Sequence, residues 1–199
     1  MNIQQIVIGR IFMDQSSKQL LESQIRECYG RVVWSHKTQE KCADIILKRN
    51  NFLKWMQIVL STLTTTGLVV TIFGDVVWVK ITSAIVSAVL LLLNTYLKSK
   101  DLGAIAQQHS NAAADIWNVR ESYLSMLTDL KMDDVSIENI RKKRDKLQEG
   151  LASIYKGSPR TISKAYKEAK RALKLNEEMT FSDEEIDSFL PVELRKVKK

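Results

Sequence analysis

The residues that could bind a metal are few and far apart in the sequence. A metal site would have to draw on two cysteines and two histidines, which are Cys28, His36, Cys42 and His109. Their spacing matches no zinc module, because ligand pairs in such modules lie only a few residues apart. His109 also falls on an apolar stripe, where it more simply packs or bonds a neighbour. We therefore expect no metal and no cofactor, and two free thiols.

Catalytic signatures are missing from the sequence. It contains no phosphate-binding glycine-lysine loop, no dinucleotide-binding glycine pattern, no nucleophile elbow and no H-E-x-x-H pair. Two pairs of carboxylates, Asp133 with Asp134 and Glu184 with Glu185, lie in turn or helix-cap contexts that explain them without catalysis. The sequence therefore predicts a protein that is not an enzyme.

The polar residues with the most informative spacing lie inside two apolar runs. The first run carries Ser61 and Thr65 among its hydroxyl residues. In the second, Ser83, Ser87 and Asn94 follow one another at i, i+4 and i+11, which places them on one helix face. Two interpretations remain open: helix–helix packing, with hydroxyls bonded across the seam or back to their own helix, or a water-contacting stripe in an oligomer. Packing alone is favoured, although a deep amide such as Asn94 normally has a partner.

These residues must be positioned by two uncharged segments. Trp55–Gly74 is 20 residues long, and as a helix it would extend about 30 Å, the hydrocarbon thickness of a bilayer. Asp75 follows and predicts a turn. The next uncharged run, Ile81–Leu97, has 17 residues. It lengthens to 76–97 when Lys80 extends its ammonium group to the lipid headgroups.

The rival interpretation is a hairpin buried inside a soluble bundle, as a soluble nucleic-acid-binding protein would require. Two uncharged helices around one turn need an apolar environment on every side. The rest of the chain is too charged and too short to provide it, with 27% charged residues overall. The sequence therefore predicts an all-α protein with a two-pass transmembrane hairpin over 55–97, made of spans 55–74 and 76–97.

Basic residues predict the orientation of this hairpin. Those beside its two ends are Lys48, Arg49, Lys54, Lys98 and Lys100, whereas the connecting loop has only Lys80, partly offset by Asp75. By the positive-inside rule both termini are cytoplasmic. Trp55 and Tyr96 then lie at the inner interface and Trp78 at the outer one. The basic residues are expected to hold anionic lipid, at about 1 kcal/mol each near the surface.

The cytoplasmic flanks are predicted to be long helices that pair with each other. Residues 1–54 form the N-terminal cytoplasmic helical region, in which Ser16 or Ser17 caps a helix that runs from about Lys18 towards Asn50. Residues 98–132 form a stalk that continues the second span without a break. Apolar stripes at helical spacing support this prediction. The first stripe is Leu21, Ile25, Cys28 and Val32, and the second is Leu102, Ile105, Ala106, His109, Ala113, Ile116, Val119, Tyr123, Met126, Leu127 and Leu130.

Residues 133–199 are predicted to be a small helical region, after a break at Lys131–Asp134. Ser136 caps one helix, which Gly157-Ser158-Pro159 ends, with Pro159 in the first turn of the next. Ser182–Glu185 is a capping box for a short helix that ends before Pro191.

Charge is arranged in blocks near the C-terminal end. Residues 156–175 carry seven basic side chains and one acidic, whereas 176–187 carry six acidic and none basic. The two blocks could pair within a chain or between chains. The basic runs Arg141–Arg144 and Lys164–Lys174 could neutralise phosphates, but they lack interleaved aromatic residues for base stacking. We therefore expect no specific nucleic acid partner, and a solvated helix face is the simpler account.

Seven segments, in this order and spacing, point to a known family. They are W-S-H-K (34–37), L-K-W-M-Q-I-V-L-S-T-L-T-T-T-G (53–67), A-Q-Q-H (106–109), Y-L-S-M-L-T-D-L (123–130), I-R-K-K-R-D-K-L-Q (140–148), S-P-R-T (158–161) and F-S-D-E-E-I-D-S-F-L-P (181–191). Together they resemble the SLATT proteins, the SMODS- and SLOG-associating two-transmembrane effectors of bacteria. The resemblance extends from about Leu20 to Lys196.

The resemblance implies a membrane effector of a bacterial conflict system, chiefly for defence against phage. Such an effector would form a homo-oligomer and permeabilise the bacterial inner membrane when a sensor is triggered. In many relatives the trigger is a nucleotide signal that a partner nucleotidyltransferase makes or a SLOG domain reads, and some relatives occur beside a reverse transcriptase. This chain carries no recognisable nucleotidyltransferase or SLOG segment, so the resemblance implies a separate partner protein. The alternative is a non-conducting membrane anchor or scaffold that recruits a cytoplasmic partner through its helices.

Overall fold

A computed structural model describes residues 3–74, 76–133 and 135–196, with side chains described from residue 15 onward. Helices make up 87% of the described residues, and no strand occurs among them, which confirms the all-α prediction. The elements are α1 (Ile3–Phe73), α2 (Val77–Lys100), α3 (Leu102–Met132), α4 (Ile137–Gly157), α5 (Ser163–Lys174), α6 (Asp183–Phe189) and the 3-10 helix η1 (Val192–Leu194).

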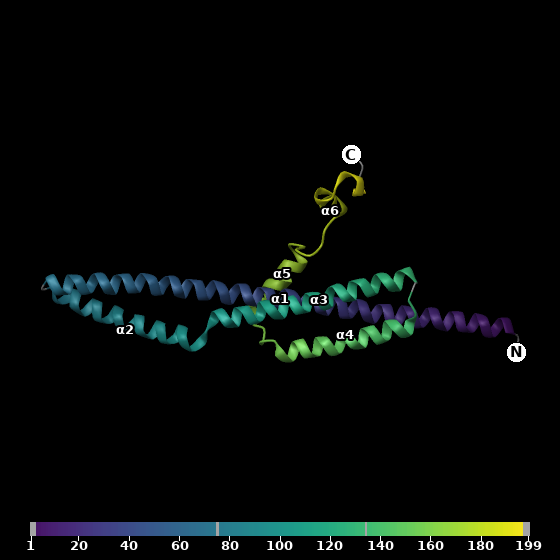
Figure 1. Ribbon diagram of the computed structural model, residues 1–199, viewed down its shortest axis with the longest axis horizontal. Coiled ribbons are helices and arrows are strands. Elements are labelled where there is room, and N and C mark those ends of the chain that lie inside the picture. Colours follow the sequence, from purple (N-terminus) through teal and green to yellow (C-terminus); the bar gives the residue numbers. More distant parts are fainter. Residues whose placement is uncertain (1–2, 75, 134, 197–199) are drawn as a thin grey trace.

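The molecule is a long rod built along α1 (Figure 1). This helix has 71 residues, a length of about 105 Å. From the hairpin end of the rod, the chain runs back through α2 and then α3, which lie antiparallel to α1. Helix α4 reverses direction again and lies beside α3. Helices α5 and α6 project sideways from the middle of the rod. The prediction that Ser16 or Ser17 caps the first helix is wrong, because both residues lie inside α1. Neither proline nor a turn-forming cluster occurs around them, so nothing stops the helix from beginning upstream.

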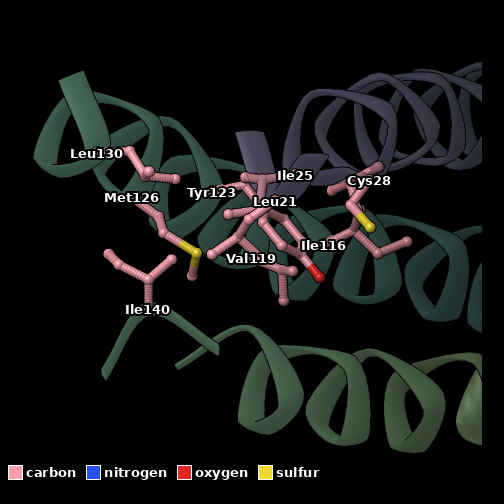
Figure 2. Close-up of a cluster of buried hydrophobic side chains, with 10 residues drawn as sticks. Leu21, Ile25, Cys28, Ile116, Val119, Tyr123, Met126, Leu130 and Ile140 are labelled. Carbon is pink, nitrogen blue, oxygen red and sulfur yellow. The ribbon is translucent and has the colours of Figure 1, made fainter. Parts of the chain in front are cut away.

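The two predicted stripes form the core of the half of the rod that lies away from the α1–α2 hairpin. Leu21, Ile25, Cys28 and Val32 of α1 pack against residues of α3 and are all buried. Figure 2 shows Tyr123 between the two helices, with Ile140 of α4 approaching Met126 from below. Tyr123 has no exposed surface, and burial of its ring raises the pKa of its hydroxyl to about 12. The helical spacing of the apolar residues therefore predicted the partner faces correctly.

The second span and the stalk are two helices, so the prediction of one continuous helix is wrong. α2 ends at Lys100, and Asp101 adopts a left-handed conformation with φ 34° and ψ 60°. The Asp101 carboxylate accepts a hydrogen bond from the backbone N–H of Ala104, at 3.1 Å, and thereby caps α3. Asp tolerates the left-handed region better than most residues, and its side chain satisfies a free N–H of the new helix.

The C-terminal region follows the predicted caps in most respects. Ser136 caps α4, which ends at Gly157, and Ser182 and Glu185 form the expected capping box of α6. Pro159 was expected in the first turn of the next helix, and this is wrong because α5 begins only at Ser163. Ser158 is extended before the proline, as steric contact with a proline ring requires, and the segment to Ile162 stays outside the helix. In the predicted break before α4, the structure describes Lys131–Asp133, where α3 ends, and Asp134 lies outside the described residues.

Small residues attach α5 to the rod. Ala165, Ala169 and Ala172 are buried on the side of α5 that packs against α1. The ring of Tyr166 lies 5.2 Å from the ring of Trp34, centroid to centroid. Alanines at this spacing let two helix backbones approach closely, which holds a short helix in place with little apolar area.

Candidate functional site

The membrane-crossing candidate is the antiparallel pair formed by the distal part of α1 and by α2. The two helices approach each other closely where Gly67 faces Ser83. A Cβ atom added at Gly67 would overlap the Ser83 hydroxyl and would lie 3.2 Å from the Ser83 Cβ. Glycine therefore permits this approach, as small residues do at helix seams in membranes.

Along the contact between α1 and α2, partly buried residues recur on each helix every three or four residues. On α1 they are Leu60, Thr64, Gly67 and Thr71, and on α2 they are Val79, Ser83, Val86, Leu90 and Leu93. This is the pattern of two helices that pack along one narrow stripe. The seam leaves the rest of each helix surface uncovered by the chain itself.

The five polar residues predicted to share a packing or pore face are divided by the structure. Ser83 lies in the seam, whereas Ser61, Thr65, Ser87 and Asn94 are exposed on outward surfaces. Among the described residues, neither the Ser87 hydroxyl nor the Asn94 amide has a hydrogen-bond partner, whereas the Thr65 hydroxyl bonds to its own helix. Spacing of i and i+4 placed Ser83 and Ser87 together, but a seam this narrow includes only one of them.

Depth in the span also differs among these residues. Asn94 is four residues from Lys98, about 6 Å along the helix, so its amide lies near the end of the span. Ser87 is 11 residues from Lys98, about 16 Å, which is close to half the hydrocarbon thickness. Mid-span polarity on the outward face therefore comes from Ser87, and the Asn94 amide can reach the headgroup region.

Threonine hydroxyls along the first span bond to their own helix. Each of the five donates to the carbonyl four residues earlier, at 2.8 to 3.0 Å; they are Thr62, Thr64, Thr65, Thr66 and Thr71. A hydroxyl bonded in this way is satisfied without water or a neighbouring helix. The threonine-rich sequence is thus less polar in the folded helix than its composition indicates.

No described part of the chain covers the apolar surface of the hairpin. None of the residues of α2 is buried, and large apolar side chains of both helices are exposed, as Leu92 is at 70% and Ile72 at 66%. Two described helical stretches are long and apolar enough to cross a membrane. In the most apolar 18 residues of each stretch, no residue is buried. A hairpin buried in a soluble bundle would show the opposite, so that interpretation is excluded for the described residues. Such a surface is stable in lipid.

The predicted boundary residues gather at one end of the hairpin. The guanidinium of Arg49 donates to the hydroxyl of Tyr96 at 2.9 Å and lies 5.8 Å from the centre of its ring. The exposed side chains of Lys48, Lys54 and Trp55 lie on the adjacent part of α1, and those of Lys98 and Lys100 on the end of α2. Trp78 is 76% exposed at the opposite end. The Arg49–Tyr96 contact joins the two helices at this end of the hairpin, and sequence spacing gave no sign of it.

The sequence model of the SMODS and SLOG-associating 2TM effector domain family 4 matches residues 21–185. The chain belongs to this SLATT family. Neither a curated protein nor a solved structure matches it. The family consists of two-transmembrane effectors of bacterial conflict and defence systems and is not a known enzyme family. The uncovered hairpin and the family together place this SLATT protein at the membrane.

Beyond the hairpin, the SLATT chain buries a row of polar groups between α1 and α3. The imidazole Nδ1 of His36 lies 3.0 Å from the carbonyl of Ala113, and the ring of His109 is hydrogen-bonded to the side-chain oxygen of Gln39. Asn50, which lies 11 residues after Gln39 on α1 and nearer to the hairpin, is also buried. Burial lowers the pKa of His109, so its ring stays neutral at ordinary pH. These polar contacts fix the register of α1 against α3, because each buried group needs its own partner.

The residues considered for a metal site are not brought together. Cys28 belongs to the core beside Tyr123, and Cys42 is buried beside the segment that precedes α5, where burial raises the pKa of its thiol. His36 and His109 make separate hydrogen bonds. Among the described residues of this SLATT protein, no group of three or more His, Cys, Asp or Glu side chains could hold a metal ion.

Proposed function

We propose that this SLATT protein is a two-pass inner-membrane effector that oligomerises and permeabilises the bacterial membrane when a partner sensor is triggered. The observation that carries the proposal is the hairpin itself, whose apolar surface no part of the chain covers. The long cytoplasmic rod would place both termini and the sensing surface on the inner side. The basic and aromatic cluster around Arg49 and Tyr96 supports this orientation, since such residues favour the cytoplasmic boundary.

Oligomerisation follows from the geometry of a single hairpin. Two helices cannot enclose a water-filled path, and the seam between α1 and α2 is closed by the contact of Gly67 with Ser83. Any path for ions must therefore run between hairpins. The outward face with Ser87 and Asn94 is the polar surface available for that contact, with Ser61 and Thr65 on the outward side of the first span.

The trigger is proposed to come from a separate protein. The family takes its name from association with SMODS and SLOG systems, which make or read nucleotide signals. The partner would then be a nucleotidyltransferase, a SLOG protein or a reverse transcriptase encoded nearby. Its contact surface would be the cytoplasmic rod, and membrane lipid would be the other partner.

A non-conducting anchor or scaffold is the second candidate. The observation in its favour is the bonding of five threonine hydroxyls back to their own helix, which leaves the first span with little free polarity for water. A scaffold would still need the membrane hairpin and the rod, but its outward faces would contact only lipid and other helices.

Membrane depolarisation on expression separates these two functions. We would express the chain together with its neighbouring genes, confirm resistance to carbonate extraction, and follow membrane potential with a dye. Ser87→Leu and Asn94→Leu should reduce depolarisation without loss of insertion, because both changes alter only outward polar positions. Leu92→Ala is the matched control, an exposed apolar residue on the same helix. Equal loss of depolarisation in the control would refute the polar-face assignment, and insertion without depolarisation in the unaltered chain would make the protein a scaffold.

A further inference from the structure

The basic block of residues 156–175 is left without acidic partners in its own chain. Among the described residues, none of its seven basic side chains forms an ion pair. Lys167, Lys170 and Arg171 are exposed on the side of α5 opposite its buried alanines. Tyr166 and Leu175, at 51% and 76% exposure, add apolar surface beside these charges. The outer face of α5 is thus both basic and apolar.

The acidic block is used only in part within the chain. Glu178 pairs with Lys37 of α1 at 2.8 Å, and Asp183 pairs with Lys196 at 3.1 Å. Neither partner belongs to the basic block. Charge alone would allow the acidic and basic blocks to pair within one chain or between two chains. Among the described residues, the structure shows no pairing of the two blocks within the chain.

The segment after Glu178 has the complementary chemistry to the outer face of α5. We define the C-terminal module as residues 181–194, which contain α6 and η1 and carry five acidic and no basic side chains. The apolar residues of this module are also unpartnered: Phe189 is 81% exposed, Val192 73% and Leu194 65%. Contiguous exposed apolar side chains with acidic neighbours are typical of a surface that docks on a basic, apolar partner.

The placement of the module favours a second copy of the chain as that partner. Figure 1 shows α5 and α6 projecting sideways from the middle of the rod, with the membrane hairpin at one end. Hairpins embedded in one bilayer fix neighbouring rods at the same height and in the same direction. The module of one rod therefore lies at the level of α5 on the next, and a head-to-tail contact of this kind can repeat around a closed ring.

We propose that the C-terminal module of one protomer docks on the outer face of α5 of its neighbour. Glu184 and Glu193 would face Lys167, Lys170 and Arg171, while Phe189 would cover the apolar surface at Tyr166 or Leu175. This proposal rests on the oligomer of the proposed function and names the surface that links its cytoplasmic parts.

Cysteine crosslinking between two differently tagged full-length chains tests the contact. One chain carries Phe189→Cys and the other Lys170→Cys; they are expressed in the same cell, and the membranes are oxidised. The native Cys28 and Cys42 are buried, so the parent chain controls for their background. We expect a crosslinked dimer that carries both tags. Pairing Phe189→Cys with Glu149→Cys, an exposed position on α4, should give no such dimer.

Charge reversal then tests the chemistry of the contact. Lys167→Glu with Arg171→Glu, on the Lys170→Cys chain, should lower the mixed dimer about tenfold, the effect expected of like charges brought together. Glu184→Lys with Glu193→Lys on the Phe189→Cys chain should restore it. If the crosslink forms only when both cysteines are in one chain, the docking is intramolecular and the proposal is wrong.

A separate crosslink distinguishes failure of the docking from failure of the oligomer. Chains with Ser87→Cys should form dimers through their outward hairpin faces if the oligomer exists. Hairpin dimers without the Phe189–Lys170 dimer would overturn the docking and leave the proposed function standing. Loss of both crosslinks would overturn both.

Discussion

Replacing Gly67 by alanine perturbs the seam of the hairpin at one defined point. The added Cβ would overlap the Ser83 hydroxyl and would lie 3.2 Å from the Ser83 Cβ. The hydroxyl can rotate away, because it ends a short side chain, but the two Cβ atoms cannot. The helices must therefore separate by a few tenths of an ångström along the seam, where the neighbours of Gly67 on α1 also pack.

The expected cost follows from this geometry. Overpacking a close contact costs about 1–3 kcal/mol, and the rotation of Ser83 places Gly67→Ala near the lower end, at about 1 kcal/mol. Gly67→Leu has no such escape and should cost about 3 kcal/mol. Because the clash that rotation cannot relieve is between the two Cβ atoms, the double variant Gly67→Ala with Ser83→Gly, which removes the Ser83 Cβ, should recover most of the loss, with a coupling energy of about 1 kcal/mol.

Unfolding in mixed detergent micelles measures these differences. The purified full chain is titrated with a denaturing detergent, and hairpin separation is followed by energy transfer between labels on the two spans. Gly150→Ala is the matched control, because no atom lies within 4 Å of the added Cβ on the exposed side of α4. The control should be neutral or stabilising by up to about 1 kcal/mol, the propensity gain of alanine over glycine. Additive effects of Gly67→Ala and Ser83→Gly would refute the contact, because residues that touch must show coupling.

Three further predictions concern the cytoplasmic half. Asp101→Ala should lower the free energy of unfolding by about 1–2 kcal/mol, since it removes a cap and leaves alanine at positive φ, whereas Asp101→Asn should retain most of the stability; thermal unfolding checks both. Burial lowers the pKa of His109 from 6.5, so stability should fall as the pH drops below 6.5, where the unfolded chain takes up a proton that the folded ring resists. His109→Gln should flatten that part of the profile of Tm against pH. The hydrogen bond from Lys37 lowers the pKa of Glu178 from 4.5 to about 2, so its contribution to stability should be full above pH 4.5 and disappear towards pH 2. In Glu178→Gln, hydrogen exchange near α5 should be faster at pH 7, and Tm should lose this acid dependence.

The parts of the fold that the sequence predicts best are those governed by repeated hydrophobic spacing. The stripe from Leu21 to Val32 and the part of the second stripe from Ile116 to Leu130 are buried against each other as expected. The helix caps at Ser136 and Ser182 were predicted equally well. Each of these serines satisfies a free backbone N–H group of a residue close to it in sequence. Both kinds of signal depend only on near neighbours, so no knowledge of the tertiary arrangement is needed to find them.

The candidate site was less predictable, because a seam depends on residues far apart in the chain. Ser83 and Ser87 share a helix face by spacing, and only the position of Gly67 across the seam separates their environments. The Arg49–Tyr96 contact likewise joins two helices whose relative register no local pattern specifies. His109 lay on a recognised apolar stripe and His36 did not, and the hydrogen-bond partners of both could be identified only once α1 and α3 were aligned.

The break at Asp101 shows why hydrophobic periodicity alone can join two helices into one. Apolar residues keep a helical period on both sides of Asp101, since α2 packs in the seam and α3 in the core. A single residue in the left-handed region changes the direction of the chain without removing any apolar position from either stripe. The signal lay instead in the polar residues: Lys98 and Lys100 occupy the last turn of α2, where cations favour the carbonyl end of a helix, and an aspartate follows directly before the apolar Leu102. Basic residues at that position were interpreted only as membrane anchors. The same two lysines can serve both purposes, so the predicted membrane boundary coincides with the observed helix end. A sequence that places cations and then an N-cap residue after an apolar run should therefore be expected to end its helix there.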